Sequence, residues 1–178
     1  MRKILAFVAP LSVGACVGPP PVAVAPPVAP PTATIQRPAP APSSRYTGDW
    51  RDWPVTAGTW VYRQDARGSV ALFGVPGADA DVTLRCDRQA RAIYLSRRGS
   101  APDRAPLTIR TSTLTRQVAT QPTGVTPTYM AASFNPNDVL LDAIIFSRGR
   151  FTIEQATQPT LVIPVWAEVA RIAEDCRS

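Results

Sequence analysis

The chain of 178 residues contains 20 Pro, 19 Lys and Arg, 13 Asp and Glu and no His, and its formal net charge is +6. The lack of His excludes Ser-His-Asp and Cys-His catalysis and removes the most frequent metal ligand. Once Arg2 and Lys3 are set aside, 17 Arg face 13 acids, a mild net charge of +4. Such a scattered excess is unlike the dense basic stripe of a nucleic-acid-binding protein, so no nucleic-acid partner is expected.

Residues 1–15 have the features of a secretory signal peptide. Residues 1–3 include two positive charges, residues 4–13 are apolar, and two small residues directly precede Cys16. Positive, apolar and small segments in this order are typical of a signal for export. The apolar run is shorter than the about 20 residues that a permanent transmembrane helix needs.

Residues 13–16, VGAC, resemble the lipobox of bacterial lipoproteins. The resemblance implies that Cys16 is lipidated and becomes the first residue of the mature protein. Val17 stands where a signal for retention in the inner membrane typically has Asp, which implies a lipid anchor in the outer membrane and a domain that faces the periplasm. An ordinary signal peptide followed by an incidental Cys is the alternative.

Residues 16–44 are predicted to consist of the lipidated Cys and a disordered tether. Ten of the 26 residues at positions 17–42 are Pro, and most of the others are Ala and Val. This composition cannot bury a core and favours an extended polyproline II conformation. An inert spacer is the preferred interpretation, and a docking site for a proline-recognising partner is the alternative.

Residues 45–178 are expected to form a single globular domain of common size. Its first segment, residues 46–62, contains three of the four Trp. Such a density of aromatic residues is found on surfaces that stack against carbohydrate, but also in segments that pack over a sheet. Packing in the core is the preferred interpretation.

Alternating apolar residues predict a series of short strands separated by turn residues. The segments are residues 59–64, 69–75, 82–86, 91–97, 106–114, 128–134, 150–155 and 160–165. The third and fourth are predicted to form a hairpin. The predicted fold class is α+β, mainly an antiparallel β-sheet or sandwich with two short helices.

Two helices interrupt or end this series. Asn135 is the predicted cap of the first helix, Pro136 its first residue and Gly149 its stop. The second helix is predicted over residues 165–176, and it is amphipathic. The apolar stripe of this helix consists of Val165, Val169, Ile172 and Cys176.

The chain has three Cys, an odd number for an exported protein. Lipidation of Cys16 would leave Cys86 and Cys176 to pair in an oxidising compartment. We therefore predict that this disulfide fastens the last helix to the sheet.

Ser147, Arg148 and Arg150 flank Gly149 in the stretch FSRGRF. A guanidinium pair beside a glycine suits a phosphate or carboxylate, so these three residues are the candidate contact with a ligand or partner. The alternative is a helix stop whose cations complement the helix dipole. No His or Lys follows to activate Ser147, which argues against a serine hydrolase.

Other charged stretches favour ordinary surface roles. Asp79 and Asp81 are too few for a calcium cage, and Glu174 and Asp175 end a helix. Residues 97–99, RRG, are expected to be an exposed hairpin end. No metal and no cofactor are predicted.

The stretches LRCD, LLDAIIFSRGRF and LVIPVWAEVARIAEDC, within residues 82–176, resemble uncharacterised small lipoproteins of alphaproteobacteria. They are also distantly similar to invasion-associated protein B and to accessory lipoproteins of type VI secretion. The resemblance implies a periplasmic, β-rich domain in which a strand cysteine pairs with a late cysteine, and it implies no catalytic residues.

These observations favour a non-catalytic envelope lipoprotein, a periplasmic module that binds an envelope protein or a cell-wall component. The alternative is a periplasmic inhibitor of lysozyme or of a protease, with the SRGR stretch as an inserting loop. A third hypothesis is an envelope hydrolase with two opposed carboxylates in a cleft.

Overall fold

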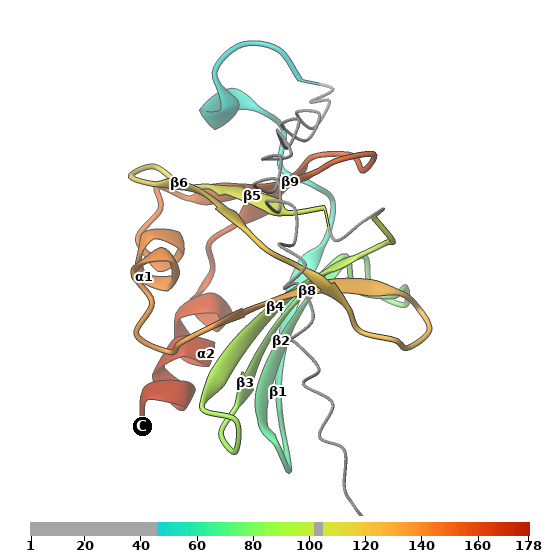
Figure 1. The fold of residues 1–178 in the computed structure, drawn as a ribbon. Helices are drawn as coiled ribbons and strands as arrows, with labels where there is room; N and C mark the ends of the chain where they lie inside the picture. Colours follow the sequence, from blue (N-terminus) through green and yellow to red (C-terminus); the bar gives the residue numbers. More distant parts are fainter. Residues whose placement is uncertain (1–45, 102–104) are drawn as a thin grey trace, which may run out of the picture. The chain divides into compact units, whose positions relative to one another are not determined.

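The computed structural model describes residues 46–101 and 105–178 (Figure 1). The predicted signal peptide, Cys16 and the predicted tether lie outside the described residues. No helix within residues 46–101 and 105–178 is long and apolar enough to cross a membrane.

A six-stranded antiparallel sheet contains most of the first half of the domain (Figure 1). Its strands lie in the order β1-β2-β3-β4-β8-β7, and the first four are joined as successive hairpins. The strand bounds are β1 Thr59–Asp65, β2 Gly68–Gly74, β3 Val82–Asp87, β4 Ala92–Arg98, β7 Gln121–Pro122 and β8 Tyr129–Phe134.

A four-stranded antiparallel sheet has the order β10-β9-β5-β6. Its strands are β5 Leu107–Arg110, β6 Thr115–Val118, β9 Arg150–Gln155 and β10 Leu161–Pro164. The free side of β10 is covered by the segment that leads into β1, because Thr56 N–H donates to the Val162 carbonyl at 2.9 Å and Val162 N–H donates to Thr56 Oγ1 at 2.9 Å. This edge is therefore not open for further pairing.

The helices are α1, Val139–Ile145, and α2, Ala167–Arg177, with a short 3-10 turn at Trp50–Asp52. Both sheets and both helices contribute to one hydrophobic core. The inner side of the six-stranded sheet packs against α2, where Leu84 and Ile93 lie beside Val169 and Ile172. These contacts confirm the predicted α+β class, with a mainly antiparallel β-structure and two short helices.

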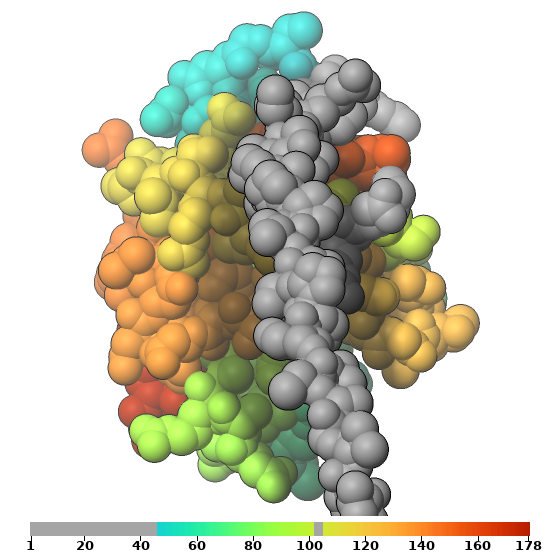
Figure 2. Space-filling model, viewed as in Figure 1, coloured from blue at the N-terminus to red at the C-terminus, as the bar shows by residue number. Residues whose placement is uncertain are grey.

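The aromatic segment at the start of the domain is core. Trp60 is buried in the main core and its indole N–H donates to the Pro164 carbonyl at 2.9 Å. Trp50 and Trp53 form a second, smaller cluster with Val162. In Figure 2 the part of this segment that precedes β1 (cyan) lies at one end of the domain, next to the β5–β6 hairpin (yellow).

Four predicted element bounds differ from the structure by more than one residue. The strand predicted over residues 106–114 ends at Arg110, because Thr111 N–H bonds the Leu114 carbonyl and turns the chain into β6. The cap of α1 is Asp138, whose carboxylate accepts from Leu140 N–H at 2.8 Å. Asn135 instead closes a turn before the helix, since its side chain accepts from Asn137 N–H.

The helix ends differ for related reasons. Helix α1 ends at Ile145, and Gly149 lies beyond it, at φ 78° in the turn that enters β9. Helix α2 begins at Ala167, because Val165 still pairs with the start of β9 through its N–H bond to the Gly149 carbonyl at 3.1 Å.

Candidate functional site

The disulfide between Cys86 and Cys176 is formed, as predicted. Cys86 lies on β3 with no exposed surface, and Cys176 lies on the last turn of α2, with their Cα atoms 5.4 Å apart. The bond ties the C-terminal helix to the inner side of the six-stranded sheet. The disulfide therefore has a structural role, since Cys86 is buried and cannot contact a partner.

The same helix is held on its polar side by β1. The Tyr62 hydroxyl donates to Asp175 Oδ2 at 2.7 Å, and the Arg171 guanidinium lies 3.9 Å from the centre of the Tyr62 ring. Burial acts to raise the pKa of Asp175, but hydrogen bonding together with the nearby charges of Arg171 and Arg88 outweighs it and leaves the pKa below its ordinary value. The Asp175 carboxylate therefore helps to hold α2 against β1 through its bond to Tyr62.

The predicted contact residues after α1 are placed in different surroundings. Ser147 is buried, and its hydroxyl donates to the Arg150 carbonyl at 2.5 Å and accepts from Ser112 N–H at 3.0 Å. The Arg150 guanidinium donates to the Trp53 carbonyl. Arg148 is exposed, and its neighbour Phe146 is 78% exposed. Of the three predicted residues only Arg148 is exposed, whereas Arg150 is half-buried and Ser147 is buried.

Many acidic side chains are paired with Arg, and two of the paired carboxylates, Asp87 and Glu154, are buried. The paired carboxylates are Asp49, Asp65, Asp81, Asp87, Asp138, Asp142 and Glu154. Asp79 and Asp81 lie on the loop that joins β2 to β3, and only Asp81 has an ion-pair partner, Arg98. No cluster of three or more metal-ligating side chains occurs among residues 46–101 and 105–178.

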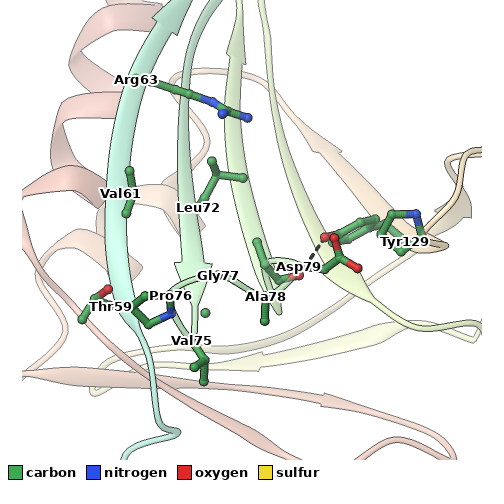
Figure 3. A pocket seen from close by; sticks show the side chains of 13 residues that line it. Thr59, Val61, Arg63, Leu72, Val75, Pro76, Gly77, Ala78, Asp79 and Tyr129 are labelled. Carbon is green, nitrogen blue, oxygen red and sulfur yellow. Dashed lines mark hydrogen bonds between the residues drawn. The ribbon is translucent and has the colours of Figure 1, made fainter.

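The outer face of the six-stranded sheet, opposite α2, is hollowed. One hollow, of about 410 Å³, has a floor of Val61 on β1 and Leu72 on β2 (Figure 3). The loop that follows β2 and Tyr129 on β8 form its far wall, where the Tyr129 hydroxyl donates to the Ala80 carbonyl at 2.7 Å. This bond ties the β2–β3 loop to β8.

A second hollow, of about 430 Å³, lies beside the first on the same face. It is lined by Thr83 on β3, by Tyr94 on β4 and by Val125 on the β7–β8 loop. Pro127 of that same loop lines the first hollow, and Leu72 is paired directly with Thr83. We call the two hollows together the outer-face groove.

The outer-face groove has one cation that the domain does not neutralise. Arg63, exposed on β1, extends over β2 in Figure 3 and forms no ion pair or hydrogen bond with the described residues. By contrast Arg85, which lines the second hollow, is paired with Asp65 at 2.7 Å. The groove therefore combines an apolar floor, where Val61 is 55% exposed, with a free guanidinium at its rim.

Sequence reasoning placed Arg97 on an exposed hairpin end, and the structure corrects this. Arg97 is only 2% exposed. Strand β4 continues to Arg98, so the two-residue alternation that buries Ile93 and Leu95 also directs Arg97 inward. Of the two Arg, only Arg98 is exposed as expected. The sequence predicted neither the outer-face groove nor the burial of Arg97, because neither feature has a sequence motif.

No protein-family model, curated protein or solved structure matches this chain.

Proposed function

We propose that the chain is a non-catalytic envelope lipoprotein, anchored in the outer membrane through Cys16, whose periplasmic domain binds another envelope protein. The sequence features at residues 1–44 support the anchoring. The single observation that supports binding is the outer-face groove, in which an apolar floor borders an unneutralised guanidinium.

A protein is favoured over a cell-wall glycan as the partner. Trp is the residue best suited to stack on sugar rings, and three of the four, Trp50, Trp53 and Trp60, are buried. The fourth, Trp166, is 45% exposed but does not line the outer-face groove. What the outer-face groove offers is the aliphatic surface of Val61 and the charge of Arg63. Apolar side chains flanking an acidic residue on a polypeptide complement this combination, because the carboxylate would supply the missing partner of Arg63.

The test is a photo-crosslinking amino acid placed at Val61 in cells, with the same amino acid at Glu174 as control. Glu174 is also exposed, but it lies on α2, on the opposite side of the sheet. A discrete protein adduct is expected from Val61 and not from Glu174. Adducts to glycan alone, or equal protein adducts at both positions, would contradict a protein-binding groove.

A charge reversal sharpens this test. Arg63→Glu should abolish the adduct at Val61, because the variant presents a carboxylate to an acidic partner. Arg148→Glu makes the same change in charge on an exposed Arg outside the groove, and it should leave the adduct intact.

A second candidate function, inhibition of lysozyme or a protease, is favoured by the loop after α1. Two hydrogen bonds join the loop to Ser112, because Ser112 N–H donates to Ser147 Oγ and Arg148 N–H donates to Ser112 Oγ at 3.3 Å. Phe146 and Arg148 project from this rigid loop, which is the form of an inserting inhibitor loop. This function would be supported if the purified protein inhibits a lysozyme or a protease, and if the inhibition is lost in Arg148→Ala and kept in Arg63→Glu. No inhibition at micromolar protein would refute it.

A further inference from the structure

Arg97 occupies a core position that sequence patterns normally give to an apolar residue. It is the largest of the fully buried side chains, at the end of β4 where the six-stranded sheet meets the loop between β9 and β10. Its guanidinium donates to the Ile153 carbonyl at 3.2 Å and to the Pro159 carbonyl. Both partners are neutral main-chain groups.

The positive charge of Arg97 has no counter-ion of its own within the described residues. Asp81 attracts it, but the Asp81 carboxylate is paired with Arg98. The Nε atom of Arg97 is buried without a hydrogen-bond partner. Burial lowers the pKa of Arg97 to about 10, so the group is still protonated at neutral pH. A charge buried in this way is costly unless an anion meets it.

A hollow of about 240 Å³ lies against this side chain. Arg97, Arg98, Asp81 and Gln158 are among the residues that line it. Its wall is fixed, because the Gln158 amide donates to the Ser100 carbonyl at 2.9 Å. Gly99 adopts φ +117°, a backbone conformation that favours glycine, and a Cβ atom there would displace the end of the Gln158 side chain, because it would lie 2.9 Å from Gln158 Oε1.

We propose that this hollow binds a carboxylate, with Arg97 as its main donor. A guanidinium has five N–H donors in a planar fork that matches a carboxylate, and two main-chain bonds leave donors to spare. The lining has two guanidinium groups and one carboxylate, Asp81, a net charge of +1. That balance suits a monoanion, whereas a phosphate dianion would leave excess negative charge beside Asp81.

The carboxylate site is independent of the proposed function. Its hollow shares no lining residue with the outer-face groove. Failure of either proposal therefore does not affect the other. The carboxylate site is tested by small-molecule affinity, and the outer-face groove is tested by a protein adduct at Val61.

Calorimetric titration of the full protein, purified as cells make it, tests the ligand chemistry. The probes are N-acetylalanine, which mimics a peptide C-terminus, its neutral amide, acetate and inorganic phosphate. We expect both carboxylates to bind, the amide not to bind, and phosphate to bind about tenfold more weakly than acetate. If N-acetylalanine binds more tightly than acetate, the ligand is a peptide C-terminus. If the two bind equally, the ligand is a small free carboxylic acid. Equal effects of N-acetylalanine and its amide, or no binding of any carboxylate at millimolar concentrations, would overturn the proposal.

Two variants tie the binding to this hollow. Arg97→Met keeps an unbranched apolar stem and removes the charge, and carboxylate affinity should fall by about tenfold or more. Asp81→Asn keeps Arg97 and raises the net charge of the lining to +2, so carboxylates should bind several-fold more tightly, and the affinity for phosphate should rise as well. Asp79→Asn, on the same loop but outside the hollow, is the matched control.

Unchanged affinity in Arg97→Met would refute the site. Should that variant not fold, the site is equally refuted if Asp81→Asn binds carboxylates no more tightly than Asp79→Asn.

Discussion

Breaking the bond between Cys86 and Cys176 is expected to lower the free energy of unfolding by about 2–5 kcal/mol. The two residues are 90 positions apart. For a closed loop of that size the chain-entropy model gives about 4.6 kcal/mol, which sets the upper part of the range. Helix α2 also keeps its packing through Val169 and Ile172, so the domain is expected to remain folded without the bond.

The two single substitutions should not be equal. Cys86 has no exposed surface, so Cys86→Ser buries a hydroxyl group in the apolar core. The Cys176 sulfur is only half-buried and lies 3.5 Å from the Ala92 carbonyl, which a Ser hydroxyl at that position could reach. We expect Cys86→Ser to cost about 1–3 kcal/mol more than Cys176→Ser, the cost of an unsatisfied buried polar group.

Urea denaturation followed by Trp fluorescence, to which the buried Trp60 contributes, measures these differences. Non-reducing mass spectrometry of the wild type verifies the linkage. The double variant Cys86→Ala/Cys176→Ser should be no less stable than Cys86→Ser alone, because one bond is lost in both. An unfolding midpoint unchanged by Cys176→Ser, or free thiols at Cys86 and Cys176 in the purified wild type, would show that the bond does not hold α2 to the sheet.

Three further predictions concern other parts of the chain. Asp138→Ala removes the cap of α1 and should cost about 0.5–2 kcal/mol in urea denaturation, whereas Asn135→Ala, before the helix, should cost less. The hydrogen bond from Arg85 lowers the pKa of Asp65 to about 2, below its ordinary 3.8, so the stability that Asp65 contributes is present above about pH 4 and is lost as the pH falls through about 2. Asp65→Asn should therefore show a shallower loss of stability over that range in denaturation curves measured at each pH. Cys16→Ser should abolish incorporation of radioactive palmitate, and persistent labelling would refute the lipid anchor.

Strands with one buried face could be predicted because burial imposes a two-residue period on their sequence. In β3 and β4 the alternation is clear, and both were placed within a residue of their observed bounds. In β6 the exposure also alternates, but none of its four residues is fully buried and only Val118 is apolar, so its sequence shows no such period. The two-residue β7 is too short to show any period. Both strands exist because a neighbouring strand offers free hydrogen-bonding groups, which the local sequence does not record.

The candidate sites were less predictable than the fold. The candidate loop at residues 147–150 was found from its Arg and Gly residues, but whether each side chain faces inward depends on Ser112 and Trp53, far away in the chain. The burial of Arg97 depends on carbonyl groups of residues 56 and 62 positions later. Single-sequence reasoning assigns Arg to the surface by default, and only the tertiary structure identifies such an exception.

The segment that covers the edge of β10 has a mechanical consequence. Tension on the chain before Tyr46 would first reach the small cluster of Trp50 and Trp53, and then the two hydrogen bonds between Thr56 and Val162. These contacts lie outside the main core, so they can yield while the central strands stay paired. At the other end of the sequence, the disulfide clamps α2 to β3 against the same pull. Under such tension the contacts of Trp50, Trp53 and Thr56 would separate first, whereas the disulfide would keep α2 attached to β3.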